Sequence, residues 1–161
     1  MTTRAQFNAD EWAVVTTAPV LAGTLVIAAD RGGSVRESLA MSQAYAAARQ
    51  HEPGELLAAI LATPPSMGPA NAPKTPEDLQ QAVPAQLRRA LRTLERVATD
   101  EEVVAYKRFV YGLAEAVARA HKEGGFLGIG GKEISPAEQA ALDRIAAIFD
   151  EPVPIENSEP S

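Results

Sequence analysis

A helix-start signal recurs along this chain and constrains its fold more than any other feature. The signal is a capping Asn, Ser or Thr followed three positions later by Glu, and the two side chains close the first turn of a helix. It occurs at Asn8 with Glu11, Ser34 with Glu37, Thr99 with Glu102 and Ser135 with Glu138. No segment shows sustained alternation of apolar and polar residues, so we expect no sheet. We therefore predict an all-α fold, a compact bundle of about six or seven helices with non-parallel crossings.

Length and composition indicate one globular domain. A chain of 161 residues has the length of a single domain and can bury a sizeable core. Hydrophobic residues make up 46% and charged residues 22%, which is typical of a globular chain. We assign residues 1–150 to one helical domain, with residues 1–6 as a loose end. Residues 151–161, EPVPIENSEPS, predict a disordered tail.

Prolines and an apolar run set the expected helix boundaries. The run over residues 13–29 is short for a membrane span and contains Thr, Pro and Gly, so we expect a buried core helix. Pro19 lacks an N–H and clashes with the preceding turn, which predicts a kink or break near Thr17. Pro84 should likewise end one helix at Ala82 and begin another.

Two further segments have apolar residues at helical spacing. The strongest pattern predicts a core face made of Val103, Tyr106, Val110, Leu113, Val117 and Ala120. The helix that follows Ser34 is expected to end by His51, and its apolar residues are Leu39, Met41, Ala44, Tyr45 and Ala48. We interpret Trp12 and Tyr106 as core residues.

Charge and cysteine content exclude several classes of site. The formal net charge of −6 disfavours nucleic acid and anionic membrane surfaces as partners. A local cluster, made of Arg88, Arg89, Arg92 and Arg96, is interpreted as a solvated helix face. The chain has no cysteine, which excludes disulfides, thiolate metal sites and cysteine nucleophiles. The N-terminal residues lack the pattern of a signal peptide, so we expect a cytoplasmic location and no membrane insertion.

The glycine-rich stretch GGFLGIGGK, residues 124–132, does not fit a nucleotide-binding loop. A P-loop requires glycine where Phe126 stands and Ser or Thr where Glu133 stands, and no strand precedes the stretch. Neither His51 nor His121 has the spacing of a zinc ligand. The sequence therefore shows no catalytic residues that we can assign.

The glycine-rich turns before Ser34 and Ser135 are similar in plan. Aligning the two serines also aligns Glu37 with Glu138, which is consistent with an internal duplication. Helix-start signals recur in helical proteins, so the match is equally consistent with two independent helix starts.

Residues 25–37, LVIAADRGGSVRE, resemble the motif of the TerB-like tellurite-resistance family. In that motif an apolar helix ends in Ala-Asp-Gly, and Ser and Glu follow. The corresponding positions are Asp30, Gly32, Ser34 and Glu37, with the glycine displaced by one. Residues 134–138 are similar to the same motif, but Gly131 stands where the Asp would be. The resemblance implies an all-helical bundle with a non-catalytic role in stress response or complex assembly, with a divalent metal bound by the acidic turns.

Two candidate sites follow from these turns. Asp30 and Glu37 are the candidate metal ligands, although one carboxylate pair falls short of the six or more oxygens that a hard cation prefers. The alternative is structural, with Glu37 capping a helix and Asp30 accepting from turn amides. Phe126, Leu127 and Ile129 are either a plug over the core or a docking surface for a partner.

We therefore expect a non-enzymatic helical interaction or assembly domain that binds a protein partner or forms a homo-oligomer. The first alternative is a divalent-metal-binding domain that uses Asp30 and Glu37. The second is an enzyme whose site cannot be recognised in the sequence, which would require a deep pocket with several titratable groups.

Overall fold

The computed structural model describes residues 2–29, 35–64, 73, 75–123 and 134–150, with the side chains of 35–38 and 121–123 left undescribed. A short 3-10 helix, η1 (Arg4–Gln6), precedes α1 (Ala9–Ala29), α2 (Val35–Gln50), α3 (Gly54–Ala62), α4 (Pro76–Val97), α5 (Asp100–Glu123) and α6 (Pro136–Phe149). The described residues contain no strand. The predicted all-α bundle is therefore confirmed, while the internal duplication stays a prediction.

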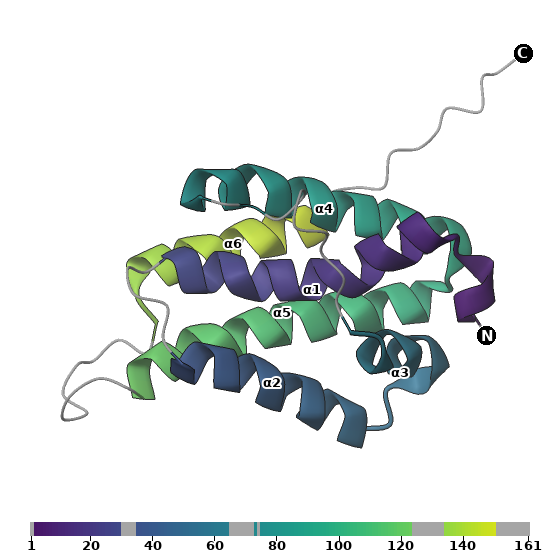
Figure 1. Ribbon diagram of the computed structural model, residues 1–161, viewed down its shortest axis with the longest axis horizontal. Coiled ribbons are helices and arrows are strands. Elements are labelled where there is room, and N and C mark those ends of the chain that lie inside the picture. The colour runs from purple at the N-terminus through teal and green to yellow at the C-terminus, as the bar shows by residue number, and fades with distance from the viewer. Residues whose placement is uncertain (1, 30–34, 65–72, 74, 124–133, 151–161) are drawn as a thin grey trace, which may run out of the picture.

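Helix α1 is the central element of the bundle. It lies between α4 and α5 and also packs against α6, while α2 lies along α5 on the side of the bundle away from α4 (Figure 1). Buried residues occur on all sides of α1 because its sequence is apolar all round. By length and composition it could also cross a membrane, with a mean hydropathy of 1.8, and 61% of that apolar window is buried inside the bundle. The prediction of a buried core helix is confirmed.

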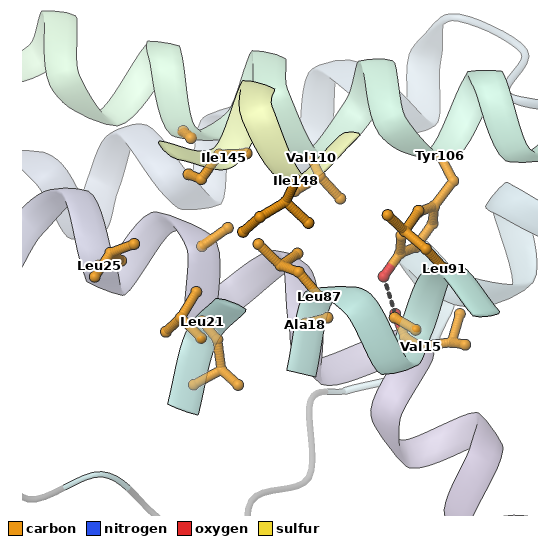
Figure 2. Close-up of a cluster of buried hydrophobic side chains, with 14 of the residues drawn as sticks. Val15, Ala18, Leu21, Leu25, Leu87, Leu91, Tyr106, Val110, Ile145 and Ile148 are labelled. Carbon is orange, nitrogen blue, oxygen red and sulfur yellow. Dashed lines mark hydrogen bonds between the residues drawn. The ribbon is translucent and has the colours of Figure 1, made fainter. Parts of the chain in front are cut away.

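The core forms where four helices meet. Figure 2 shows side chains of α1, α4, α5 and α6 converging, among them Val15, Leu87, Val110 and Ile145, which are fully buried. The predicted apolar face of α5 is buried from Val103 to Ala120. Contact between these faces removes apolar side chains from water, which is the main favourable term in forming such a bundle.

Of the kink or break predicted near Thr17, the break is wrong, because α1 continues through Pro19. A proline at position 19 cannot donate to the carbonyl of Val15, four residues earlier. That carbonyl accepts instead from the hydroxyl of Tyr106 on α5, at 2.8 Å (Figure 2). Tyr106 is only 1% exposed, so this hydrogen bond satisfies a buried acceptor that the helix itself leaves unpaired.

The predicted break before Pro84 is also wrong, since α4 runs from Pro76 to Val97 without interruption. The carbonyl that Pro84 leaves without an amide donor belongs to Gln80. Gln80 is an exposed residue, whereas Pro84 is buried. Both prolines are tolerated inside helices, and for Pro19 a core side chain donates to the vacated carbonyl.

The N-terminal residues are not the loose end that we predicted. Thr2 is 3% exposed, and its amide and hydroxyl donate to the carboxylate of Glu102 at 3.2 and 2.6 Å. The Glu102 carboxylate also accepts from the Thr99 amide at 2.9 Å, within the predicted capping box. One carboxylate therefore joins the start of the chain to the start of α5.

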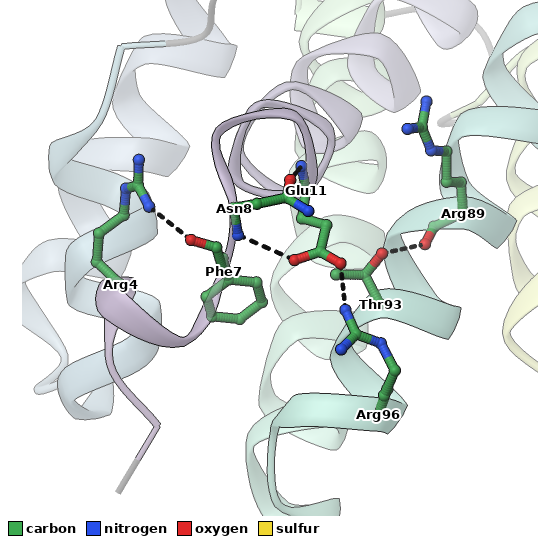
Figure 3. A network of polar contacts seen from close by, with 7 residues as sticks. All are labelled: Arg4, Phe7, Asn8, Glu11, Arg89, Thr93 and Arg96. Atoms are coloured by element: carbon green, nitrogen blue, oxygen red, sulfur yellow. Dashed lines mark hydrogen bonds and ion pairs between the residues drawn. The ribbon is translucent and has the colours of Figure 1, made fainter.

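The predicted capping boxes are confirmed where the structure describes them. At the start of α1 the Asn8 amide donates to the Glu11 carboxylate, and the Glu11 amide donates to Asn8 Oδ1. Glu11 also forms an ion pair with Arg96 of α4 (Figure 3). Ser135 and Glu138 close the start of α6 in the same way. The box that includes Ser34 lies outside the described residues.

Candidate ligand-binding cleft

Most of the site residues predicted from sequence lie outside the described residues. These are Asp30, Phe126, Leu127 and Ile129. Glu37 lies in the first turn of α2, but its side chain is not described. Among the described residues, no group of three or more His, Asp or Glu side chains is placed to hold a metal ion. The metal and docking sites therefore stay predictions.

A cleft of about 670 Å³ lies between α1, α2 and α3. Its volume falls within the range of about 300–1,000 Å³ that is usual for small-molecule sites. The described residues that line it are Val20, Thr24, Ile27, Met41, Ser42, Tyr45, Arg49, Leu61, Ala62, Thr63 and Pro64. The cleft is thus mainly apolar, with a few polar groups.

Helical spacing explains which residues face the cleft. Residues three or four positions apart share one face of a helix. Val20, Thr24 and Ile27 have this spacing on α1, and the sequence Met41, Tyr45, Arg49 repeats it on α2. Each helix therefore presents a continuous wall, with the aromatic ring and the guanidinium on the α2 side.

The hydroxyls of Thr24 and Thr63 contribute little polarity to the cleft. Thr24 Oγ1 donates to the Val20 carbonyl at 2.8 Å, and Thr63 Oγ1 donates to the Ala59 carbonyl at 2.8 Å. Each hydroxyl proton is used within its own helix or at its end, a common arrangement for helical threonine. The other described lining residues with polar side chains are Ser42, Tyr45 and Arg49, and of these Tyr45 and Arg49 are ionisable.

Tyr45 has a fixed ring and an unsatisfied hydroxyl. The ring packs edge-on against Phe109 of α5, with ring centroids 5.3 Å apart. The hydroxyl oxygen is buried and has no hydrogen-bond partner among the described residues. Burial raises the pKa of Tyr45 to about 12, although the nearby Arg49 acts to lower it. The hydroxyl therefore keeps its proton at neutral pH and can act as a hydrogen-bond donor.

Arg49 is held in place at the end of α3. Its Nε and Nη2 atoms donate to the Leu61 carbonyl at 3.3 and 2.8 Å. A cation at this position is favourable because the last carbonyls of a helix carry partial negative charge. The bonds to Leu61 do not use Nη1, and the guanidinium keeps its full positive charge at any physiological pH.

Helices α1 and α2 are in close contact beside the cleft, where Gly23 faces Met41. A Cβ atom built on Gly23 would lie 2.7 Å from Cε of Met41, too near for both atoms to keep their places. Glycine at this position therefore lets the Met41 side chain lie against α1. Methionine is flexible and adapts to irregular apolar space, so this part of the wall can move at low cost.

A second cavity is smaller and differs in charge. It encloses about 250 Å³ between α3 and α5, and Glu55, Glu101 and Glu102 line it together with apolar side chains. The Glu102 carboxylate is already bonded to Thr2 and Thr99. This cavity therefore offers less space than the α1–α2–α3 cleft, and its charged lining residues are all acidic.

Reasoning from sequence did not identify this cleft. Met41 and Tyr45 were expected only as apolar residues along their helix, and no role was predicted for Arg49. The four-residue spacing from Met41 to Arg49 is visible in the sequence, but a core face has the same spacing. The cleft forms because of how far apart α1 and α2 lie, and this distance is defined only by the folded chain.

The fold and the cleft together define a class, an all-α bundle with a largely apolar cleft whose described lining includes Tyr45 and Arg49. No protein-family model, curated protein or solved structure matches the chain. The resemblance to the TerB-like family stays a prediction from residues 25–37.

Proposed function

We propose that this protein is a non-enzymatic helical interaction domain that binds a small, mainly apolar ligand in the α1–α2–α3 cleft. The observation that supports the proposal is the composition of the cleft. Tyr45 and Arg49 are the ionisable side chains among its described lining residues. At neutral pH both are donors, so neither can accept a proton as a general base.

Acid–base catalysis in this cleft would need ionisable groups other than Tyr45 and Arg49. Acid–base catalysis uses groups whose pKa lies near the working pH, usually His, Asp or Glu. The described cleft residues include none of these. An apolar wall with a few fixed donors suits recognition, in which apolar burial supplies affinity and polar groups orient the ligand.

A role in assembly is compatible with ligand binding and is part of the same proposal. The resemblance of residues 25–37 to the TerB-like motif supports a role in a stress-response complex, with a protein partner or a second copy of the chain. A cytoplasmic location is part of the same proposal. Light scattering and pull-down experiments test this part, and a strict monomer without partners counts against it.

The binding proposal is tested with 1-octanol, an uncharged ligand with an apolar body. Octanol should raise the thermal unfolding temperature and shift the Met41 methyl resonance in NMR spectra, because only the folded state offers the cleft. The substitution Ala62→Phe places a ring in the cleft and should abolish both effects. Ala58 is an exposed residue of the same helix outside the cleft lining, so Ala58→Phe is the matched control and should leave both effects intact.

The absence of any octanol effect on the wild-type protein, up to the solubility limit, would contradict the proposed function. Equal effects in the Ala62→Phe and Ala58→Phe variants would show that octanol binds elsewhere.

A further inference from the structure

The polar end of the cleft indicates which ligands it selects. Arg49 contributes a positive charge, and Tyr45 contributes a buried hydroxyl without a partner among the described residues. A buried donor without an acceptor is unfavourable, so a ligand that supplies an acceptor gains both a hydrogen bond and the removal of that cost. An anionic oxygen satisfies both groups at once.

The geometry of α2 brings the two donors together. Tyr45 and Arg49 are four residues apart, so they lie one above the other on the same face of the helix. The guanidinium is close enough to influence ionisation of the phenol. The bonds from Arg49 to the Leu61 carbonyl fix the guanidinium before any ligand arrives, which reduces the entropy lost on binding.

We propose that the cleft binds a singly charged amphiphile, a monocarboxylate with an unbranched apolar body, whose head group bonds to Arg49 and the Tyr45 hydroxyl. The apolar body lies along Val20, Ile27 and Leu61. This proposal rests on the proposed function, because it names the ligand class of the same cleft.

The charge of the ligand follows from the charges around it. Arg49 is the one cation among the described lining residues, and the whole chain has a formal net charge of −6. A single carboxylate is matched by one guanidinium, which it can bind through two oxygens. A dianionic phosphate would keep an uncompensated charge inside an apolar cleft, which is unfavourable.

Binding requires a small movement of the cleft wall. The Tyr45 hydroxyl oxygen is covered by neighbouring atoms, so a head group reaches it only when lining side chains move aside. Met41 is four residues before Tyr45 on the same wall and is the most adaptable of the lining side chains. The methyl resonance of Met41 should therefore respond to the head group as well as to the apolar body.

Calorimetric titration of the full chain with octanoate and with 1-octanol tests the proposal. Octanoate should bind about tenfold more tightly than octanol, the difference expected for hydrogen bonds to a charged group. The Arg49→Gln substitution should remove this preference, because it weakens octanoate binding more than octanol binding. Tyr45→Phe should likewise weaken octanoate binding more than octanol binding.

Arg92 is exposed on α4, away from the cleft, so Arg92→Gln should keep the full preference for octanoate. Octanol binding without a preference for octanoate would overturn the carboxylate proposal and leave the proposed function standing. Binding of neither ligand would overturn both. Octyl phosphate binding more tightly than octanoate would overturn the assignment of a single charge.

Discussion

At the scale of single residues, two tyrosines that pack between helices differ in whether their hydroxyl has a hydrogen-bond partner. Tyr106 donates to the Val15 carbonyl at 2.8 Å, whereas the Tyr45 hydroxyl has no partner among the described residues. Burial, and after it the nearby Tyr45, raises the pKa of Tyr106 well above its ordinary range. Both tyrosines are therefore protonated donors at neutral pH, one structural and one available to a ligand.

The contact between Thr2 and Glu102 predicts how the stability of the protein depends on pH. Burial acts to raise the pKa of Glu102, but hydrogen bonds from Thr2 and Thr99 outweigh it, and the pKa lies below its ordinary value. A depressed carboxyl pKa stabilises the fold above the unfolded-state value of about 4.3, and this contribution is lost as the pH falls through the folded-state pKa. The substitution Thr2→Val removes the hydroxyl donor, so the variant should lose less stability on acidification than the wild type.

The measurement is urea unfolding of both proteins at about pH 6 and about pH 3, on either side of the ordinary carboxyl pKa. Glu102→Gln is the control, because in that background Thr2→Val should leave the pH dependence unchanged. Identical pH dependence in the wild type and Thr2→Val would show that Thr2 does not lower the pKa of Glu102.

At the scale of helices, the sequence predicts elements well where their determinants are local. The boxes at Asn8, Thr99 and Ser135 were correctly predicted because both partners lie within one turn of helix. The breaks at Pro19 and Pro84 were wrongly predicted because tolerance of a proline depends on what reaches the vacated carbonyl. For Pro19 the donor lies 91 residues away from Val15 in sequence, on α5.

Tyr106 donates to the carbonyl that Pro19 leaves without an amide donor. This contact predicts that substitutions at Pro19 on α1 and Tyr106 on α5 have non-additive effects on stability. Tyr106→Phe alone should lower the free energy of unfolding by about 1–3 kcal/mol, because the buried Val15 carbonyl loses its donor. In a Pro19→Ala background the amide of residue 19 can donate to that carbonyl, so Tyr106→Phe should cost less, with a coupling energy of about 1 kcal/mol. Urea unfolding of the single and double variants measures this cycle.

Pro84→Ala is the matched control for this cycle, since the carbonyl of Gln80 belongs to an exposed residue. Tyr106→Phe should therefore keep its full cost in the Pro84→Ala background. An equal cost of Tyr106→Phe in the Pro19→Ala and Pro84→Ala backgrounds would refute the role assigned to the Val15 carbonyl.

At the scale of the whole molecule, the fold could be predicted and the candidate site could not. Apolar spacing predicted the buried face of α5 because α5 packs in the core along most of its length. On α2 the sequence predicted the apolar residues of the helix but assigned them no buried face, and Leu39, one of them, is 55% exposed. The wall of α2 that faces α1 borders a cleft instead of a packed core, and periodicity cannot distinguish the two.

The cleft depends on the placement of α1, α2 and α3, which short sequence motifs do not encode. Nothing in the sequence distinguishes Met41, Tyr45 and Arg49 from other residues on a helix face. Only the folded structure shows that the Leu61 carbonyl holds the Arg49 guanidinium and that the Tyr45 hydroxyl is buried without a partner among the described residues. The candidate sites predicted from the sequence are Asp30 with Glu37 and the turn that contains Phe126. Both lie largely outside the described residues. Their roles as metal ligands or docking residues stay separate predictions.

The most direct test of this account is the free energy of unfolding of the wild type and Tyr45→Phe, measured in urea with and without octanoate. Without octanoate the variant should be more stable by about 1–2 kcal/mol, because it loses an unsatisfied buried hydroxyl and keeps the ring packed on Phe109. With octanoate the wild type should gain more stability than the variant, so that the difference shrinks or reverses. A less stable variant that gains as much from octanoate as the wild type would contradict the account.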